Sequence, residues 1–311
     1  MAIATLPPGL LCGLVWGLAT AAAAAQSLDL SLPPGENYQT AEFRLWLPPQ
    51  LETVDAVLVL VPGSNGDGRG QVEDATWRDL AMAHDLGLLG VRLTDRRHEQ
   101  MFLEAYVEAS KGSGAALLTA LDGFAIQARR PELAEAPLLL WGMSAGGQFN
   151  YEFALWQPER VLAFVVNKGG VYYSALASRA ARRVPGMFFI GADDLEYRND
   201  VIAGIFAVNR RAGALWALAR EPGIGHAVGG SKSVAAAFFR DILRLRLGDD
   251  DATPSRNRLR PLDPESGWVG DPKTHEVLPS AAAPRTRYPT SWLPTKELAL
   301  AWQQMVRTES G

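Results

Sequence analysis

Ser144 is the residue whose surroundings most favour chemistry. The stretch LLLWGMSAGGQF passes from an apolar segment through GMSAG at 142–146 into residues that suit a helix. Glycine weakens the first turn of a helix, so an ordinary strand-to-helix joint does not favour this sequence. A tight bend that holds a serine hydroxyl clear of its neighbours does need it. The pattern therefore predicts a nucleophilic serine, with a simple tight turn as the alternative.

A serine hydroxyl is a poor nucleophile without a base, and the chain has four histidines. His226 lies in REPGIGHAVGG, a glycine-rich loop after the apolar segment ALWALA, and we predict it to be the base. His98 follows the segment LLGVRL and is a candidate substrate contact. His84 falls in a helical stretch and His275 in the C-terminal region, and we expect packing or surface roles for both.

The carboxylate that orients the base is expected between Ser144 and His226, in the chain order that G-x-S-x-G enzymes use. The apolar segment GMFFIG ends in two adjacent aspartates, Asp193 and Asp194. Successive residues at the end of a strand point to opposite sides, so only one of them can reach the histidine. We favour Asp194 and keep Asp193 as the alternative. The other aspartate would cap the following segment.

Two backbone N–H groups are expected to stabilise an oxyanion that forms at the serine. The first belongs to Ala145, at the start of the helix. The second is expected from the loop PGSNG at 62–66, which follows the apolar segment Ala56–Val61. We choose Ser64 as this donor, with Asn65 next.

The segments that must hold these residues alternate between strand and helix patterns. LDLSLP and AEFRLWLP near the start alternate with period two and predict an antiparallel hairpin. Continuous apolar runs then alternate with helical stretches up to SVAAAFFRDILRL, which predicts an α/β fold with a mostly parallel sheet and helices on both faces. Near the end, WVGDPKTHEVL suggests a small hairpin, and a helix is expected after Thr295 with Leu298, Trp302 and Met305 on one stripe.

Three regions are expected from changes in composition. Residues 1–25 end in an alanine-rich apolar stretch before Gln26 and resemble a cleavable signal peptide, although no Lys or Arg precedes the stretch. Residues 26–248 form the predicted catalytic domain, and residues 249–311 form an extension docked on it. We therefore expect a secreted or periplasmic protein that has no stable insertion in a membrane after cleavage.

Composition excludes several classes of function. The chain has 311 residues, is 48% hydrophobic and carries a formal charge of −4, so nothing favours nucleic acid as a partner. The single cysteine, Cys12, lies within the predicted signal, which excludes disulfides and cysteine chemistry in the mature chain. The acidic residues lack the histidine or cysteine partners of a metal site, and we expect neither metal nor cofactor. Nothing in the sequence indicates an oligomeric state.

With GMSAGG at 142–147, Asp194 and His226, residues 28–247 resemble the α/β-hydrolase superfamily. The likeness is greatest to secreted bacterial esterases of the polyhydroxybutyrate depolymerase and feruloyl esterase kind. Pro62 stands where that family commonly has a histidine before Gly63, and the lack of cysteines also departs from many of its members. The resemblance implies hydrolysis of a small-molecule or polymer-linked ester by a Ser-His-Asp triad through an acyl-enzyme.

Two other functions share much of this pattern. A serine peptidase of the same fold would use the same residues, and a non-catalytic binding protein of this fold usually has a broken triad. The loops after the predicted strands also carry polar and aromatic residues that could contact substrate or form a solvated rim. They are Arg96, Arg97, Asn167, Lys168, Tyr172 and Tyr173. Our candidate substrate contacts are Asn65, His98, Lys168 and Tyr172.

Overall fold

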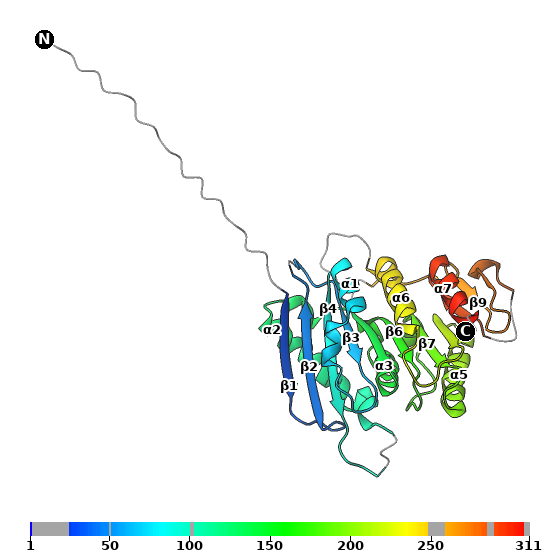
Figure 1. Ribbon diagram of the computed structural model, residues 1–311, viewed down its shortest axis with the longest axis horizontal. Coiled ribbons are helices and arrows are strands. Elements are labelled where there is room, and N and C mark those ends of the chain that lie inside the picture. The colour runs from blue at the N-terminus through cyan, green and yellow to red at the C-terminus, as the bar shows by residue number, and fades with distance from the viewer. Residues whose placement is uncertain (2–24, 50, 100–102, 248–258, 285–288, 308–311) are drawn as a thin grey trace.

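Figure 1 shows the computed structural model of the protein, which describes residue 1 and residues 25–49, 51–99, 103–247, 259–284 and 289–307. The predicted signal peptide, apart from its first and last residues, lies outside the described residues. Residues 249–258, at the start of the predicted extension, also lie outside them.

Eight strands form one sheet in the order β1-β2-β4-β3-β5-β6-β7-β8. β1 pairs with β2 and β2 with β4 in antiparallel register, while β4-β3-β5-β6-β7-β8 are parallel neighbours. The predicted N-terminal hairpin and mostly parallel sheet are confirmed. The strands are β1 (Gln26–Leu32), β2 (Thr40–Leu47), β3 (Ala56–Val61), β4 (Leu86–Thr94), β5 (Leu138–Met143), β6 (Val161–Asn167), β7 (Gly186–Gly191) and β8 (Trp216–Glu221).

Helices cover both faces of the sheet, as the alternating pattern predicts (Figure 1). They are α1 (Ala75–Ala83), α2 (Ser113–Gln127), α3 (Ala145–Trp156), α4 (Arg179–Arg182), α5 (Glu196–Arg211), α6 (Ser231–Arg246) and α7 (Lys296–Arg307). The helix expected near 76–86 ends at Ala83, because β4 already begins at Leu86.

Alternation of side chains along the buried strands creates two cores. On β3, Val57, Val59 and Val61 pack on the side of α2, α3 and α5, whereas Leu58 and Leu60 pack on the side of α1, α6 and α7. Every residue of β3 is buried. The β-branched run therefore forms a central strand rather than an edge.

Parallel strands end at one common edge of the sheet, and the loops that follow them carry the predicted site. Ser64 follows β3, Ser144 follows β5, Asp194 follows β7 and His226 follows β8. Because β5, β7 and β8 are parallel and lie within four adjacent strands, these loops can converge.

The C-terminal segment covers the free edge of β8. It forms a three-stranded sheet in the order β10-β9-β11, from β9 (Trp268–Gly270), β10 (Val277–Pro279) and β11 (Ser291–Leu293), followed by α7. The predicted hairpin is β9 with β10, and β11 is a third strand that the sequence analysis did not predict. Thr295 caps α7 as expected, since its Oγ1 accepts from Leu298 N–H at 3.1 Å.

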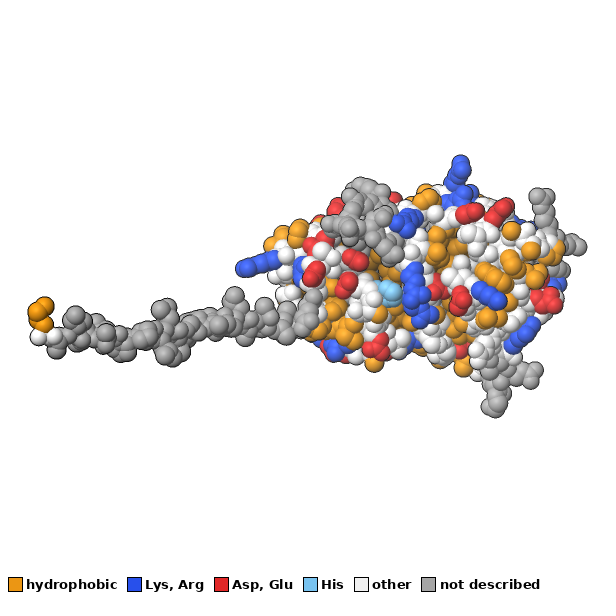
Figure 2. Space-filling view, turned by 90° about the horizontal axis from the view of Figure 1, so that it is seen from above, with side chains coloured by type: hydrophobic (Ala, Val, Ile, Leu, Met, Phe, Trp, Pro, Cys, Tyr) orange, Lys and Arg blue, Asp and Glu red, His pale blue; other side chains and the backbone are white. Residues whose placement is uncertain are grey.

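The surface carries charges of both signs. On the face that Figure 2 shows, Lys and Arg side chains lie among Asp and Glu side chains, with apolar side chains between them. Within the part of the chain that the structure describes, no helix has both the length and the apolar content that crossing a membrane requires.

Candidate active site

Ser144 lies on a sharp turn between β5 and α3. Its backbone has φ 54° and ψ −122°, a conformation that residues other than glycine rarely adopt, and its N–H donates to Asn167 O at 2.8 Å. The glycines of the motif allow close approach of the backbone. A Cβ on Gly146 would lie 2.3 Å from Val61 O, and a Cβ on Gly142 would lie 2.3 Å from the carbonyl carbon of Gly146. Glycine is therefore required there because α3 crosses directly against β3 and β5.

The structure brings Ser144, His226 and Asp194 together. His226 Nε2 lies 3.0 Å from Ser144 Oγ, and His226 Nδ1 lies 2.7 Å from Asp194 Oδ2. A carboxylate only accepts hydrogen bonds, so Nδ1 carries the ring proton and Nε2 is left to accept from the serine hydroxyl. The His226 side chain is 30% exposed, which leaves the serine end of the relay accessible from solvent.

Asp194, and not Asp193, is the aspartate that reaches the histidine. Its side chain is only 3% exposed, and its Oδ1 accepts from Leu195 N–H at 2.7 Å and from Arg198 Nη1 at 3.1 Å. Burial acts to raise the pKa of Asp194, but the hydrogen bonds from His226 and Leu195 N–H outweigh it and lower the pKa below its ordinary value. The carboxyl is therefore ionised at neutral pH. Asp193 is exposed.

The two predicted oxyanion donors belong to segments that lie beside the serine. Ala145 is the first residue of α3, where a backbone N–H has no partner within the helix. The 62–66 loop approaches the elbow, since a Cβ on Gly63 would lie 3.7 Å from Ser144 Cβ. In the part of the chain that the structure describes, no group accepts from Ser64 N–H, whereas Asn65 N–H donates to Tyr106 Oη at 3.2 Å. This geometry favours Ser64 over Asn65 as the second donor.

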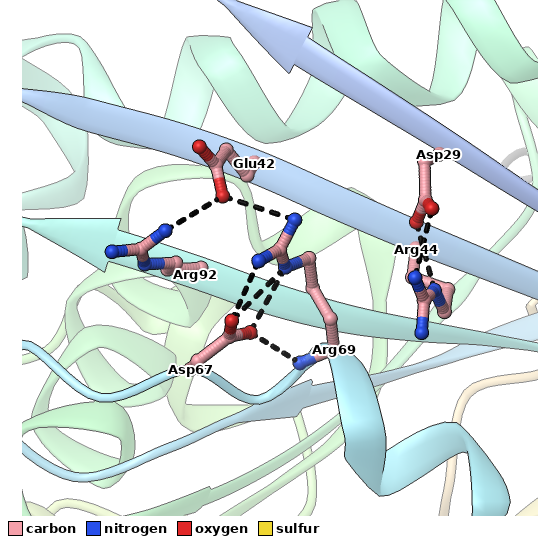
Figure 3. A network of polar contacts seen from close by, with 6 residues as sticks. All are labelled: Asp29, Glu42, Arg44, Asp67, Arg69 and Arg92. Carbon is pink, nitrogen blue, oxygen red and sulfur yellow. Dashed lines mark hydrogen bonds and ion pairs between the residues drawn. The ribbon is translucent and has the colours of Figure 1, made fainter.

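A charged network fixes the far end of that loop on the sheet (Figure 3). Arg69 Nη2 lies 2.6 Å from Asp67 Oδ2, and Arg69 Nη1 lies 3.0 Å from Glu42 Oε2 on β2. Arg92 on β4 also contacts Glu42, at 2.9 Å. The hydrogen bond from Arg69 lowers the pKa of Asp67 to about 2, so Asp67 stays ionised at neutral and mildly acidic pH. Arg69, just after the loop that carries Ser64, is thus tied to Glu42 on β2, which also binds Arg92 on β4.

Two of the four candidate substrate contacts are corrected by the structure. Lys168 is completely buried, with its Nζ 2.5 Å from Glu221 Oε2, and so does not line an open rim. Asn167 beside it is also completely buried. The hydroxyl of Tyr172 is buried near Gly169, and the residue as a whole is half-buried. Strand β6 ends deeper beneath the loops than the polar sequence there suggests.

The other two candidates lie close to the oxyanion loop. The Asn65 side chain is engaged locally, since its Oδ1 accepts from Asp95 N–H at 2.7 Å and its Nδ2 donates to Ser64 Oγ at 3.2 Å. His98 Nε2 lies 3.2 Å from Asp95 Oδ2, and the His98 side chain is 28% exposed. Both remain predicted substrate contacts, with Asp95 as a common anchor that the sequence analysis did not single out.

Sequence reasoning also missed Arg198 and Glu221. Arg198 lies four residues after Asp194 on α5, and this helical spacing was the available signal. Arg220 and Glu221 end β8 with charges, and Glu221 is the buried one, where an acid needs a partner. The identity of that partner could not be read from the sequence, because Lys168 lies 53 residues away.

No protein-family model matches the chain, and no curated protein matches it in sequence. Solved structures do match its fold. An S-formylglutathione hydrolase from Staphylococcus aureus aligns with 73% of this chain and 100% of its own, at 12% identity and a TM-score of 0.50. A ferulic acid esterase aligns with 71% of this chain and 99% of its own, at 14% identity and a TM-score of 0.52. A poly(3-hydroxybutyrate) depolymerase from Bordetella parapertussis aligns with 70% of this chain and 90% of its own, at 17% identity and a TM-score of 0.51.

The chain has the α/β-hydrolase fold. The predicted fold class is confirmed, and so is the resemblance as far as the fold is concerned. Within this α/β-hydrolase fold, the serine follows β5, the aspartate follows β7 and the histidine follows β8. The fold alone does not specify a reaction, so the reaction has to be argued from the site.

Proposed function

We propose that this protein is a serine hydrolase that cleaves carboxylic esters through an acyl-enzyme. The observation that carries the proposal is the unbroken relay from Ser144 Oγ to His226 Nε2 at 3.0 Å and from His226 Nδ1 to Asp194 Oδ2 at 2.7 Å. Both distances are within hydrogen-bonding reach without any substrate present. A site that only binds a ligand has no need of this relay.

In the first half of the reaction, Ser144 Oγ attacks the ester carbonyl carbon while His226 Nε2 takes the serine proton. Asp194 stabilises the imidazolium that forms, and the N–H groups of Ala145 and Ser64 stabilise the oxyanion. The imidazolium then gives its proton to the leaving alkoxy oxygen. The carbon–oxygen bond breaks, the alcohol leaves and the acyl group stays on Ser144.

In the second half, water takes the place of the alcohol. His226 removes a proton from the water as its oxygen attacks the acyl carbon, and the same two N–H groups stabilise the second oxyanion. When this intermediate collapses, the acid leaves and the proton on His226 returns to Ser144 Oγ. The enzyme is regenerated without metal or cofactor.

The names of two structural neighbours support esters as the substrate class. One is named as a ferulic acid esterase and the other as a poly(3-hydroxybutyrate) depolymerase, and both share the fold of this chain at TM-scores of 0.52 and 0.51. We therefore propose a small-molecule or polymer-linked ester as the substrate. Parallel assays on short acyl esters, feruloyl esters and polyhydroxybutyrate would distinguish these classes.

Hydrolysis of p-nitrophenyl acetate by the parent and by Ser144→Ala tests the proposal. We expect the variant to fold like the parent and to lose at least about 1000-fold in kcat. Ser27→Ala is a matched control, because Ser27 is exposed on β1 and should leave kcat unchanged. A folded Ser144→Ala protein with undiminished hydrolysis would refute the proposal.

We also propose that residues 1–25 are a signal peptide that directs export. In support, β1 begins at Gln26, directly after the proposed cleavage site, so cleavage would remove no described strand or helix. Mass spectrometry of the exported protein should find Gln26 as the first residue. Protein that is exported with residues 1–25 still attached would contradict the proposal.

A further inference from the structure

Lys168 and Glu221 form a buried ion pair beneath the loop that carries His226. Lys168 Nζ lies 2.5 Å from Glu221 Oε2, and the two side chains are 0% and 9% exposed. Lys168 directly follows β6, and Glu221 is the last residue of β8. The attraction within a buried pair is largely offset by the loss of hydration of both ions, so stability alone is a poor explanation for it.

Both partners also bind the backbone of the loop, residues 222–230. Lys168 Nζ donates to Val228 O at 3.4 Å, and Gly230 N–H donates to Glu221 Oε1 at 2.5 Å. His226 lies only two residues before Val228. The pair therefore fixes the half of the loop that follows the histidine.

The half of the loop that precedes the histidine is tied to the segment that carries the acid. Asp193 directly precedes Asp194 in the chain, and its N–H donates to Ile224 O at 3.0 Å. His226 is thus held between two anchors, one on the aspartate loop and one on the ion pair. Movement of either anchor would shift the imidazole ring of His226.

Strand β6 connects the ion pair to the nucleophile. Asn167 O accepts from Ser144 N–H at 2.8 Å, and Lys168 is the next residue along the chain. Two consecutive residues thus hold the serine and the histidine loop. If Lys168 moved relative to Glu221, the distance between Ser144 and His226 would change.

We propose that Lys168 and Glu221 are positioning residues that keep His226 within hydrogen-bonding distance of Ser144. The inference rests on the proposed serine-hydrolase function and names two further residues on which that reaction depends. Among the described residues, neither side chain has a hydrogen bond or ion pair with Ser144 or His226, and both bind the backbone of the loop instead. Misplacing a catalytic group by about 1 Å can cost on the order of 100-fold in rate, so a small movement is enough to matter.

Gly229→Ala disturbs the pair without removing either charge. Gly229 has φ 57°, and a Cβ there would lie 2.4 Å from Glu221 Oε1. We expect kcat for p-nitrophenyl acetate to fall by about 10- to 100-fold while KM changes by less than about threefold. Gly213→Ala is the matched control, because Gly213 has φ 86° and no atom within 4 Å of its Cβ position. Gly213→Ala also forces alanine into a positive-φ backbone conformation, as Gly229→Ala does, but should keep the kcat of the parent.

The double variant Lys168→Met and Glu221→Leu removes both charges while nearly preserving volume. Replacing both partners together avoids an unpaired buried charge, so we expect this variant to fold. Its kcat should fall as in Gly229→Ala, again with little change in KM. Arg246→Met is the control, because Arg246 is a buried cation near the other end of β6, with Nη1 2.6 Å from Leu162 O. That change should lower stability and leave the kcat of the folded protein unchanged.

The proposal is overturned if Gly229→Ala folds and keeps kcat within about twofold of Gly213→Ala. The same result for a folded double variant would overturn it too, and Gly229→Ala decides alone if the double variant does not fold. Ser144→Ala separates the proposed serine-hydrolase function from the proposed positioning role of Lys168 and Glu221. If Ser144→Ala is inactive while the loop variants keep full kcat, only the positioning role fails. If Ser144→Ala is active, the proposed function itself fails.

Discussion

At the scale of the residue, the two oxygens of Asp194 have different partners. Oδ2 accepts from His226 Nδ1, whereas Oδ1 accepts from Leu195 N–H and Arg198. The second set of bonds holds the carboxylate in place while the first sets the tautomer of the ring. Because the pKa of Asp194 is lowered despite burial, the carboxylate remains anionic where the histidine must become cationic.

Asp194→Asn should therefore lose activity with the fold intact. An amide can pair with the wrong tautomer of His226, and we expect kcat to fall on the order of 10⁴-fold. Asp193→Asn is the control, since Asp193 is exposed and should keep the kcat of the parent. Ester hydrolysis with circular dichroism as a fold check measures both. Equal activity of the two variants would contradict the assignment of Asp194.

The lowered pKa of Asp194 also predicts a dependence of stability on pH. The carboxyl titrates near 3.8 when unfolded and below that value when folded. Its contribution is thus fully present above the unfolded pKa and is lost as the pH falls through the folded pKa. Denaturant unfolding should give a difference between the parent and Asp194→Asn that is present at neutral pH and shrinks below about pH 4. A difference that grows on acidification would be the wrong sign.

At the scale of the element, the elbow depends on how closely β5 and α3 approach β3. The position of a Cβ on Gly146 lies 2.3 Å from Val61 O, a backbone atom that cannot rotate away. Any side chain there would push α3 off the sheet and change the direction of Ser144. The glycine motif is therefore a requirement of packing as well as of chemistry.

Gly146→Ala should accordingly destabilise the protein by about 1–3 kcal/mol or more and reduce activity. Gly204→Ala is the matched control within α5, because no atom lies within 4 Å of its Cβ position. Replacing a glycine inside a helix with alanine should stabilise the protein by about 0.5–1 kcal/mol. Free energies of unfolding from denaturant titrations compare the two. The account of the elbow fails if Gly146→Ala is as stable and active as Gly204→Ala.

Elements were easier to predict from the sequence than the surroundings of single residues. Periodicity gave the hairpin, the buried strands and most helices, because alternation reflects which faces are covered. The convergence of Ser144, Asp194 and His226 could be anticipated, since each follows a strand at the same edge of a parallel sheet. The burial of Lys168 could not, because it depends on Glu221 from a strand that is distant in sequence. Strand β11 was also missed, since its three residues are too few to show a period and no short turn joins it to β9 as one joins β9 to β10.

At the scale of the whole molecule, the C-terminal segment protects the last strand of the main sheet. Leu218 on β8 donates its N–H to Ser291 Oγ at 2.9 Å, and Leu218 O accepts from Ser291 Oγ at 3.0 Å and from Trp302 Nε1 at 2.8 Å. An uncovered edge strand offers free backbone groups to other chains. Docking of β11 and α7 occupies those groups. This gives the segment a structural role that needs no contact with the triad.

Trp302→Ala should remove much of the packing of α7 on the edge of β8. The side chain is 1% exposed, so its loss should cost about 3–5 kcal/mol and promote aggregation. Leu300→Ala on the same helix is the control, because Leu300 is 48% exposed and should shift stability by less than about 0.5 kcal/mol. Denaturant unfolding and light scattering measure the two effects. Similar stability of both variants would show that α7 is not essential to the edge.

The most direct test of the central claim is to map the site that a fluorophosphonate probe modifies. A probe of this kind reacts with a serine whose hydroxyl is activated by a base, and peptide mass spectrometry then locates the adduct. We predict a single adduct on Ser144 in the parent and strongly reduced labelling in a folded His226→Ala variant. Parent protein that is left unlabelled, or that is labelled equally with and without His226, would contradict the account.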